Sequence, residues 1–285
     1  MYHAREISNL TATSRVLVDD GIVIVPEVYS LSDIAEINAA MNPVFKSKEG
    51  EKRAYIRPDE MLKIGIFDKI LSPAMIDLLL SIMPDPVLYH LHAYEIAGNS
   101  NQSHIFADQL GGWHRDPDSS YFENDPTHIS VFVYLTHVGE GDGAFELSPQ
   151  KPNRELRPDS PAVIMTGPPG LSFAWHRSFY HRASPNRGVR RRRLIKISVQ
   201  RNEFPSVHLK SDFFRSAIEQ TPTGDPAMDI LLGRFQGKKA PQLAPSTTIR
   251  PERVEAAKSI DLPDDILKGL RAKERAAIGQ AVAYD

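Results

Sequence analysis

The chain has 285 residues, of which 41% are hydrophobic and 25% are charged, a composition typical of a globular protein with a substantial core. The formal net charge of −2 gives no support to general nucleic-acid binding. The absence of cysteine excludes disulfides, thiolate metal sites and cysteine nucleophiles.

The sequence shows no targeting signal or membrane-spanning segment. The first twenty residues contain no apolar core of a secretory signal. No window reaches the roughly 20 apolar residues that are needed to cross a bilayer. We therefore expect a cytoplasmic protein that binds neither membranes nor nucleic acid.

The first third of the chain predicts one short strand and two helices. The run GIVIVPEV (21–28) is rich in β-branched residues and contains a proline, which is typical of an edge strand. Ser30 and Asp33 have the spacing of a capping box, so a helix should follow them. A second helix is predicted over 71–83, with Ser72 as its N-cap and proline at its first position.

From Val87 the pattern changes to short strand-like runs, which are VLYHLHAYEI, THISVFVYL, PAVIMT, LSFAWH and RRLIKISVQ. Turn clusters such as AGNSNQ, GEGDG and ASPNRG separate them. Several short strands with no helices between them predict a mostly β core, either a barrel or a double-sheet jelly roll, with flanking helices. After Phe204 the pattern is helical again. We expect one β domain over residues 1–205 and a helical C-terminal extension, 206–285, packed on the same domain.

One tripeptide in this region combines metal-binding side chains. His114 and Asp116 flank Arg115, and residues two apart on a strand point to the same face. Non-haem ferrous iron is commonly held by two histidines and one carboxylate, with the other positions open. With ten histidines in the chain, one His-x-Asp arises by chance about as often as not. The second histidine would be His176 or His181.

Four consecutive arginines, Arg190 to Arg193, begin the last predicted strand. Only alternate ones can face a core, and only if they meet an anion there, because arginine binds carboxylates bidentately. The alternative interpretation is a solvated strand edge that charge protects from aggregation.

The sequence lacks the motifs of two other enzyme classes that could use these residues. A protein-kinase interpretation of His-Arg-Asp requires an asparagine five residues after the aspartate, where this chain has Tyr121. A zinc hydrolase of the common type requires His-Glu-x-x-His, which the chain lacks. The metal hypothesis is therefore the one that we carry forward.

Three segments, in order and spacing, resemble one family. GGWHRD, THISVFVYLTHVGEGDGAFELSPQKP and WHRSFYHRASPNRGVRRRRLIKISVQ are similar to phytanoyl-CoA dioxygenase-like proteins, over about residues 15–200. These are Fe(II)/2-oxoglutarate-dependent oxygenases with a double-stranded β-helix core, which is a jelly-roll, cupin-like fold. The resemblance implies Fe(II), 2-oxoglutarate and O2 as cofactor and co-substrates.

The resemblance also assigns residues. It implies three metal ligands that act as the catalytic set: His114, Asp116 and His181. It implies that Arg192 binds the C5 carboxylate of 2-oxoglutarate, and Tyr94 and Gln109 are candidates for hydrogen bonds to the C1 carboxylate. Candidates for substrate contact are Arg115, Arg177 and Trp113.

The implied reaction is the oxidation, most simply the hydroxylation, of an unactivated C–H bond of a small-molecule metabolite, with release of succinate and CO2. The arginines near the histidines would suit an acidic substrate. Related halogenases replace the ligand carboxylate with a small residue, so Asp116 favours hydroxylation or another oxidation. The alternatives are a non-catalytic jelly-roll binding protein and an iron oxygenase that does not use 2-oxoglutarate.

Overall fold

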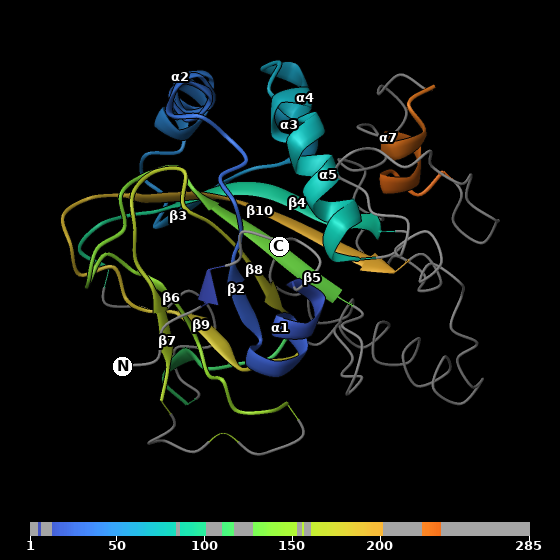
Figure 1. Ribbon diagram of the computed structural model, residues 1–285. Coiled ribbons are helices and arrows are strands. Elements are labelled where there is room, and N and C mark those ends of the chain that lie inside the picture. The colour runs from blue at the N-terminus through green and yellow to red at the C-terminus, as the bar shows by residue number, and fades with distance from the viewer. Residues whose placement is uncertain are drawn as a thin grey trace, which may run out of the picture.

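The computed structural model describes residues 5–6, 13–83, 86–100, 110–116, 128–152, 156, 161–201 and 224–234. Their strands form two sheets (Figure 1). The larger sheet runs in the order β1 (Arg5–Glu6), β2 (Ile22–Ile24), β8 (Ser172–His176), β5 (His128–Tyr134), β10 (Arg192–Arg201), β4 (Pro86–Ile96) and β3 (Arg53–Ile56). The smaller sheet runs in the order β7 (Val163–Met165), β6 (Phe145–Leu147) and β9 (His181–Ala183). The jelly-roll prediction is confirmed.

Helices cover one face of the larger sheet, which we call its outer face. The helices are α1 (Thr13–Asp20), α2 (Leu31–Ser47), α3 (Pro58–Lys63), α4 (Phe67–Ile70), α5 (Pro73–Ile82) and α7 (Pro226–Leu231), with a 3-10 turn, η2 (Leu110–Gly112). Helices α2 to α5 lie above the larger sheet, and β6, β7 and β9 lie below it (Figure 1). None of the described helices combines the length and the apolar composition that a membrane-spanning segment requires.

Strand alternation builds two separate cores. Ile195 and Ile197 of β10 pack with the helices on the outer face. Leu194 points to the inner face, where it packs with residues of both sheets such as Phe145 and Phe173. Because successive side chains on a strand point to opposite faces, the central strands are buried on both sides. The space between the two sheets is therefore lined by every second residue of these strands.

Both predicted helix starts are confirmed. The Ser30 hydroxyl accepts a hydrogen bond from the Asp33 backbone N–H at 3.1 Å, and the Asp33 carboxylate accepts one from the Ser30 N–H at 2.8 Å. Ser72 caps α5 by accepting from the Met75 N–H, and Pro73 is the first residue of that helix. These local bonds satisfy backbone donors that a helix start leaves unpaired.

The edge-strand prediction for residues 21–28 and the alternative interpretation of the arginine run as a solvated edge are both wrong. Strand β2 lies between β1 and β8, so it is not at the edge of the sheet. Strand β10 lies at the centre, between β5 and β4, so its arginines do not protect a solvated edge. Arg191 and Arg193 instead form ion pairs with Glu95 of β4, each at 2.7 Å, on the outer face. Arg192 points to the inner face and is 1% exposed.

One part of the predicted C-terminal extension is described. Helix α7 packs against α5 and β4, and its buried residues Met228, Ile230 and Leu231 join the core of the outer face. The other predicted helical segments after Phe204 lie outside the described residues. The division into residues 1–205 and 206–285 therefore stays a prediction.

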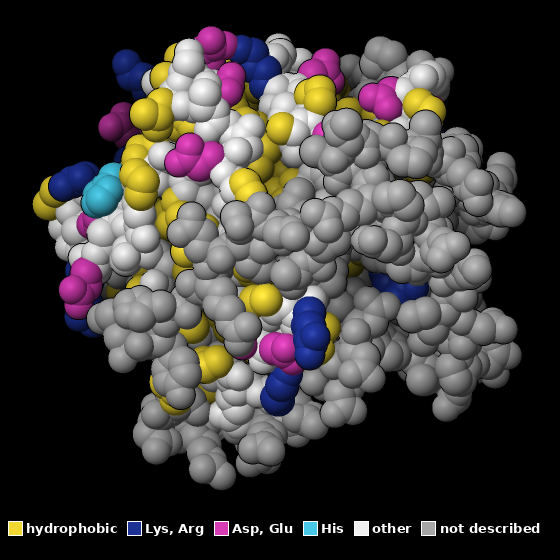
Figure 2. Space-filling model, in the orientation of Figure 1, with side chains coloured by type: hydrophobic (Ala, Val, Ile, Leu, Met, Phe, Trp, Pro, Cys, Tyr) yellow, Lys and Arg dark blue, Asp and Glu magenta, His cyan; other side chains and the backbone are white. Residues whose placement is uncertain are grey.

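Charged side chains of both signs are interspersed on the face of the molecule in Figure 2, including the surface of the helical layer. This mixture agrees with a formal net charge of −2, in which 34 basic residues nearly balance 36 acidic ones. A strongly basic face, as nucleic-acid binding requires, is not visible among the described residues in this view.

The capping box of α2 offers a test of this local structure. The substitution Ser30→Ala removes the hydroxyl that accepts from the Asp33 N–H and should lower the free energy of unfolding by about 1 kcal/mol. Urea denaturation would measure the change. The matched control is Ser32→Ala, an exposed serine in the first turn, which should change the value by less than about 0.5 kcal/mol. Equal effects of the two substitutions would contradict the capping role.

Candidate metal centre

Two segments that are distant in the sequence meet at a backbone bridge. His114 and His181 are an antiparallel pair in which each residue donates its N–H to the carbonyl of the other, at 3.1 and 2.9 Å. Side chains of directly opposed residues lie on the same face. The two imidazole rings are therefore adjacent, with centroids 4.4 Å apart.

A second hydrogen bond fixes each ring. The Nδ1 atom of His114 lies 2.9 Å from the Gly112 carbonyl, and Nδ1 of His181 lies 2.9 Å from the Phe179 carbonyl. A carbonyl can only accept, so each Nδ1 carries the proton and each Nε2 keeps its lone pair. Metal-ligating histidines commonly show this arrangement, because the outer bond fixes the tautomer and the ring orientation.

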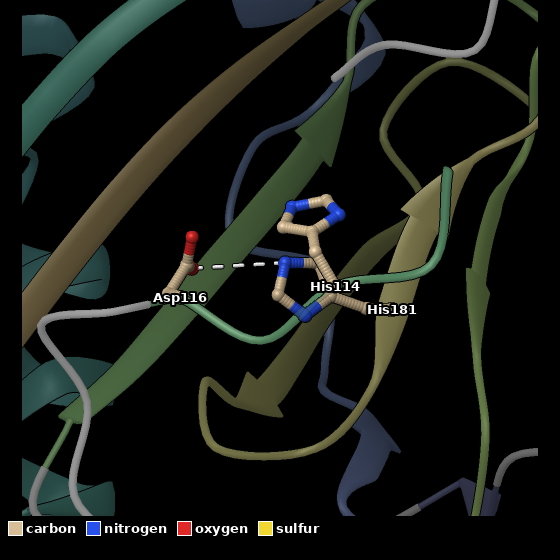
Figure 3. A group of neighbouring side chains, drawn as sticks. All are labelled: His114, Asp116 and His181. Atoms are coloured by element: carbon tan, nitrogen blue, oxygen red, sulfur yellow. Dashed lines mark ion pairs between the residues drawn. The ribbon is translucent and has the colours of Figure 1, made fainter. Parts of the chain in front are cut away.

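Asp116 completes the group two residues after His114 (Figure 3). One potential ligand atom from each of the three side chains lies within 4.8 Å of the others. The Asp116 Oδ2 atom is 3.7 Å from Nε2 of His181 and 2.9 Å from a guanidinium nitrogen of Arg177. Arg177 is buried and also donates to Ser198 at 3.1 Å. The buried guanidinium of Arg177 therefore holds the Asp116 carboxylate in place.

The donor set fits a divalent metal ion. Two ligands that are each about 2.1 Å from a metal are separated by about 3 Å at right angles and by about 4.2 Å when they are opposed, and the His181–Asp116 distance of 3.7 Å lies in this range. Two neutral imidazole nitrogens and a carboxylate suit ferrous iron, which also leaves positions open for other ligands. A cation between these acceptor atoms would be favourable, because each of them presents a lone pair.

Burial keeps both histidines in the form that binds metal. Desolvation, followed by the effect of neighbouring His114, lowers the pKa of His181 to about 3. Desolvation also lowers the pKa of His114, while Asp116 opposes this shift. Only a neutral imidazole has a lone pair for a metal, so the site is ready for a cation at neutral pH.

The structure brings His181 rather than His176 next to His114 and Asp116. His176 lies on β8, is fully buried, and accepts a hydrogen bond at Nδ1 from the Ser178 N–H at 3.2 Å. It is not part of the cluster of potential metal ligands in the described part of the chain. His181 stands in the cluster because β9 pairs with the His114 segment.

Arg192 lies on the inner face, as expected for a binding residue. Its guanidinium donates to the Tyr94 hydroxyl at 2.8 Å and to the Gly143 carbonyl. Its Nε atom has no hydrogen-bond partner among the described residues. Tyr94 is thus next to Arg192, and burial raises the pKa of its hydroxyl, so it stays protonated.

The remaining residues that were predicted to bind substrate or co-substrate make other contacts or are not described. Arg115 is directed to the Pro152 carbonyl at 2.5 Å and to the Tyr180 ring. The Trp113 ring packs under the guanidinium of Arg182 at 4.6 Å. Arg177 holds Asp116, as described above. Gln109 lies outside the described residues. The predicted substrate roles of Arg115, Arg177 and Trp113 gain no support from these contacts and stay predictions.

Sequence reasoning missed three polar residues on the inner face: His90, His92 and Lys196. Lys196 lies four residues after Arg192 on β10 and therefore shares its face. Strand alternation counted from Arg192 could have identified it. The histidines of β4 alternate with apolar residues in the run VLYHLHAYEI, and the same period would have placed them on one face.

Comparisons with known proteins agree with this geometry. A family model described as phytanoyl-CoA dioxygenase (PhyH) matches residues 17–194. Among solved structures, AviO1 from Streptomyces viridochromogenes Tue57 has a TM-score of 0.56 and 16% identity, over 68% of this chain and 96% of that one. SnoN, a non-haem α-ketoglutarate-dependent epimerase from nogalamycin biosynthesis, has a TM-score of 0.54 and 18% identity, over 68% and 82%.

SnoK, a carbocyclase from the same biosynthesis that is also non-haem and α-ketoglutarate-dependent, has a TM-score of 0.53 and 16% identity, over 67% of this chain and 83% of that one. At such low identities these similarities establish the shared fold and no more. No curated protein matches the sequence of this chain.

The buried histidines predict a pH dependence for the metal-free protein. An unfolded histidine has a pKa of about 6.5, whereas burial lowers the pKa of both His176 and His181 to about 3. Below about pH 6.5 the unfolded state therefore binds protons that the folded state does not, and the free energy of unfolding should fall. Each histidine contributes up to about 1.4 kcal/mol per pH unit.

Urea denaturation between about pH 6.5 and pH 5 would measure this dependence, since most carboxylates stay ionised there. A free energy of unfolding that does not change over this window would contradict the burial of neutral imidazoles.

Proposed function

The chain belongs to the phytanoyl-CoA dioxygenase family, and we propose from that premise that it is an Fe(II)- and 2-oxoglutarate-dependent oxygenase of a small-molecule substrate. The observation that carries the proposal is the convergence of two Nε2 lone pairs and one carboxylate on a single point, with both rings fixed through Nδ1. A binding protein with the same fold would have no need for such a group.

In this proposal three residues hold the metal: His114, Asp116 and His181. Arg177 keeps the carboxylate in place through the 2.9 Å ion pair. The rings of Phe145 and Trp175 pack against His181, at 5.7 and 4.2 Å between centroids, and limit the access of water from that side. Bound iron supplies the activation of O2, and the chain supplies position and exclusion of water.

Arg192 is proposed to bind the C5 carboxylate of 2-oxoglutarate. Its hydrogen-bond partners among the described residues, Tyr94 and Gly143, are both uncharged. A buried guanidinium is costly unless an anion neutralises it. The Nε atom, which has no described partner, leaves a donor available for such an anion. Tyr94, for which the sequence predicted a contact with the C1 carboxylate, would instead position Arg192 and contact the C5 end of the co-substrate.

We propose hydroxylation of an unactivated C–H bond as the reaction, coupled to release of succinate and CO2. The relatives named above include an epimerase and a carbocyclase, so this fold also accommodates other oxidative outcomes in those proteins. The presence of a carboxylate at Asp116 fills the third protein ligand position. That leaves the remaining positions to 2-oxoglutarate and O2, which is the ligand set that hydroxylation requires.

The ligand role of Asp116 predicts a loss of activity in Asp116→Ala. Without the carboxylate, the metal loses one of three protein ligands, and succinate formation that depends on substrate should fall below detection. Succinate would be measured after incubation with Fe(II), 2-oxoglutarate and O2, with and without each member of a panel of candidate small-molecule substrates. The matched control is Asp68→Ala, at an exposed aspartate of α4, which should keep wild-type activity. Full turnover by Asp116→Ala would remove this aspartate from the ligand set.

The proposed role of Arg192 predicts that its replacement lowers the affinity for 2-oxoglutarate. Replacing it by methionine removes a charge-assisted hydrogen bond and should weaken 2-oxoglutarate binding by about 10- to 100-fold. Anaerobic titration of the Fe(II) protein with 2-oxoglutarate, followed through the visible charge-transfer band, measures the affinity. Arg190→Met, at the exposed end of the same arginine run, is the control and should bind normally. Absence of the band in the wild-type protein would favour a non-catalytic jelly-roll protein.

A further inference from the structure

We propose that Lys196, together with His92 and His90, forms a subsite for an anionic group of the substrate, a carboxylate or a phosphate, beside the metal centre. The proposal rests on the proposed function, because it assigns the substrate class of the same active site. Its basis is the set of polar side chains that strand alternation places on the inner face of the larger sheet.

The register of the sheet places Lys196 on that face. On β10 the residues Ile195 and Ile197 pack outward among the helices, whereas Leu194 packs inward. Lys196 must therefore point inward with Leu194. Its Nζ atom lies 5.7 Å from the centre of the Trp175 ring, which belongs to the inner core. The Lys196 side chain is partly buried, so solvent screens its charge only in part.

His90 and His92 lie on β4, which pairs with the strand that carries Lys196. Lys196 is the direct cross-strand partner of His92, so the two side chains are neighbours on one face. A ring nitrogen of His92 lies 3.0 Å from one of His90, which joins the two imidazoles in a pair. The Tyr55 ring contacts His92 edge-on at 5.3 Å and covers the pair from β3.

His92 serves this subsite as a neutral hydrogen-bonding group. Burial lowers its pKa well below 6.5, and the neighbouring charges of Lys196, Arg57 and Arg177 lower it further. Lys196 therefore supplies the charge and the imidazoles supply hydrogen bonds. A lysine ammonium beside neutral donors is suited to a carboxylate or phosphate oxygen.

A single aromatic ring links this group to the metal centre. The Trp175 ring that Lys196 approaches has its centroid 4.2 Å from that of His181. On the same strand as Lys196, Ser198 accepts a hydrogen bond from Arg177, whose guanidinium pairs with Asp116. The Trp175 ring thus lies between Lys196 and His181. Lys196 is also two residues before Ser198, which contacts the Arg177 side chain that pairs with Asp116. An anion held there would bring an attached carbon chain close to the metal.

The charge on the inner face favours a further anion. The cationic side chains on or beside this face include Arg177, Arg192, Lys196 and, close to His92, Arg57. Asp116 pairs with Arg177, and the two negative charges of 2-oxoglutarate would neutralise Arg192 and one of the two charges of a divalent metal. Lys196 and Arg57 add positive charge beside His92, and positive potential in a partly buried site attracts anions more strongly than in water. A substrate with a carboxylate or phosphate would complete the balance.

Binding of two small anions tests the subsite without knowledge of the substrate. Inorganic phosphate is followed by its 31P linewidth and labelled acetate by its 13C relaxation, each in the presence of the protein loaded with 2-oxoglutarate. The measurement is made before and after addition of Mn(II), which shortens the relaxation times of nearby nuclei. We expect at least one anion to bind, and to relax faster with Mn(II). The anion that binds distinguishes a phosphate substrate from a carboxylate substrate.

The variants separate the charge from the packing of Lys196. Lys196→Met keeps the stem against Trp175 but removes the charge, and should weaken anion binding by about tenfold or more. Lys196→Arg should retain most of the binding. Arg190→Met, which removes an exposed positive charge elsewhere, should bind as the wild type does.

Equal anion binding by the wild type and Lys196→Met, or no binding of either anion to the wild type, would overturn the subsite. Binding that depends on Lys196 but shows no extra relaxation with Mn(II) would overturn its position beside the metal. The charge-transfer band of the Fe(II)–2-oxoglutarate complex, recorded on the same proteins, reports separately on the proposed function. It should be unchanged in Lys196→Met, and its absence in the wild type would count against the oxygenase assignment alone.

Discussion

The candidate centre depends on the pair of backbone hydrogen bonds between His114 and His181. These bonds fix the separation and the direction of two side chains that come from distant parts of the chain. The carbonyls of Gly112 and Phe179 then set the rotation and the tautomer of each ring. Because two of these bonds join backbone to backbone and the other two hold each ring to a backbone carbonyl, the geometry is already present before any cation binds, and little conformational entropy remains to be lost on binding.

The two faces of the larger sheet have different roles. The outer face packs against the helices, and the inner face carries the candidate site. On the outer face, apolar residues of β10 pack against the helices, and Glu95 forms ion pairs with Arg191 and Arg193. On the inner face, the same strand presents charged and polar residues toward the smaller sheet. Four consecutive arginines are tolerated at the start of this central strand because they divide between the faces, each of which supplies different partners.

The sequence predicted local structure well wherever the determining bonds are local. The capping box of Ser30 and Asp33 and the serine-proline start of α5 are confirmed, because these interactions form within one helical turn. The strand runs of the β core are also confirmed. The strand neighbours were predicted less well: β2 and β10 were interpreted as edges, yet both have neighbours on each side. An apolar run shows that a strand is buried, but it does not show which strands flank it.

By itself, the sequence determined the residue types and periods that make a jelly roll possible, and it placed His114 and Asp116 on one face. Its own residues left both His176 and His181 as candidates, with a weak preference for His181, and the resemblance to a family then favoured His181. Only the tertiary structure brought His181 against His114, directed Arg177 to Asp116, and set Lys196 beside His92. The physical reason is that strand period fixes the face of a residue, whereas its neighbours follow from cross-strand register, which long-range hydrogen bonds decide.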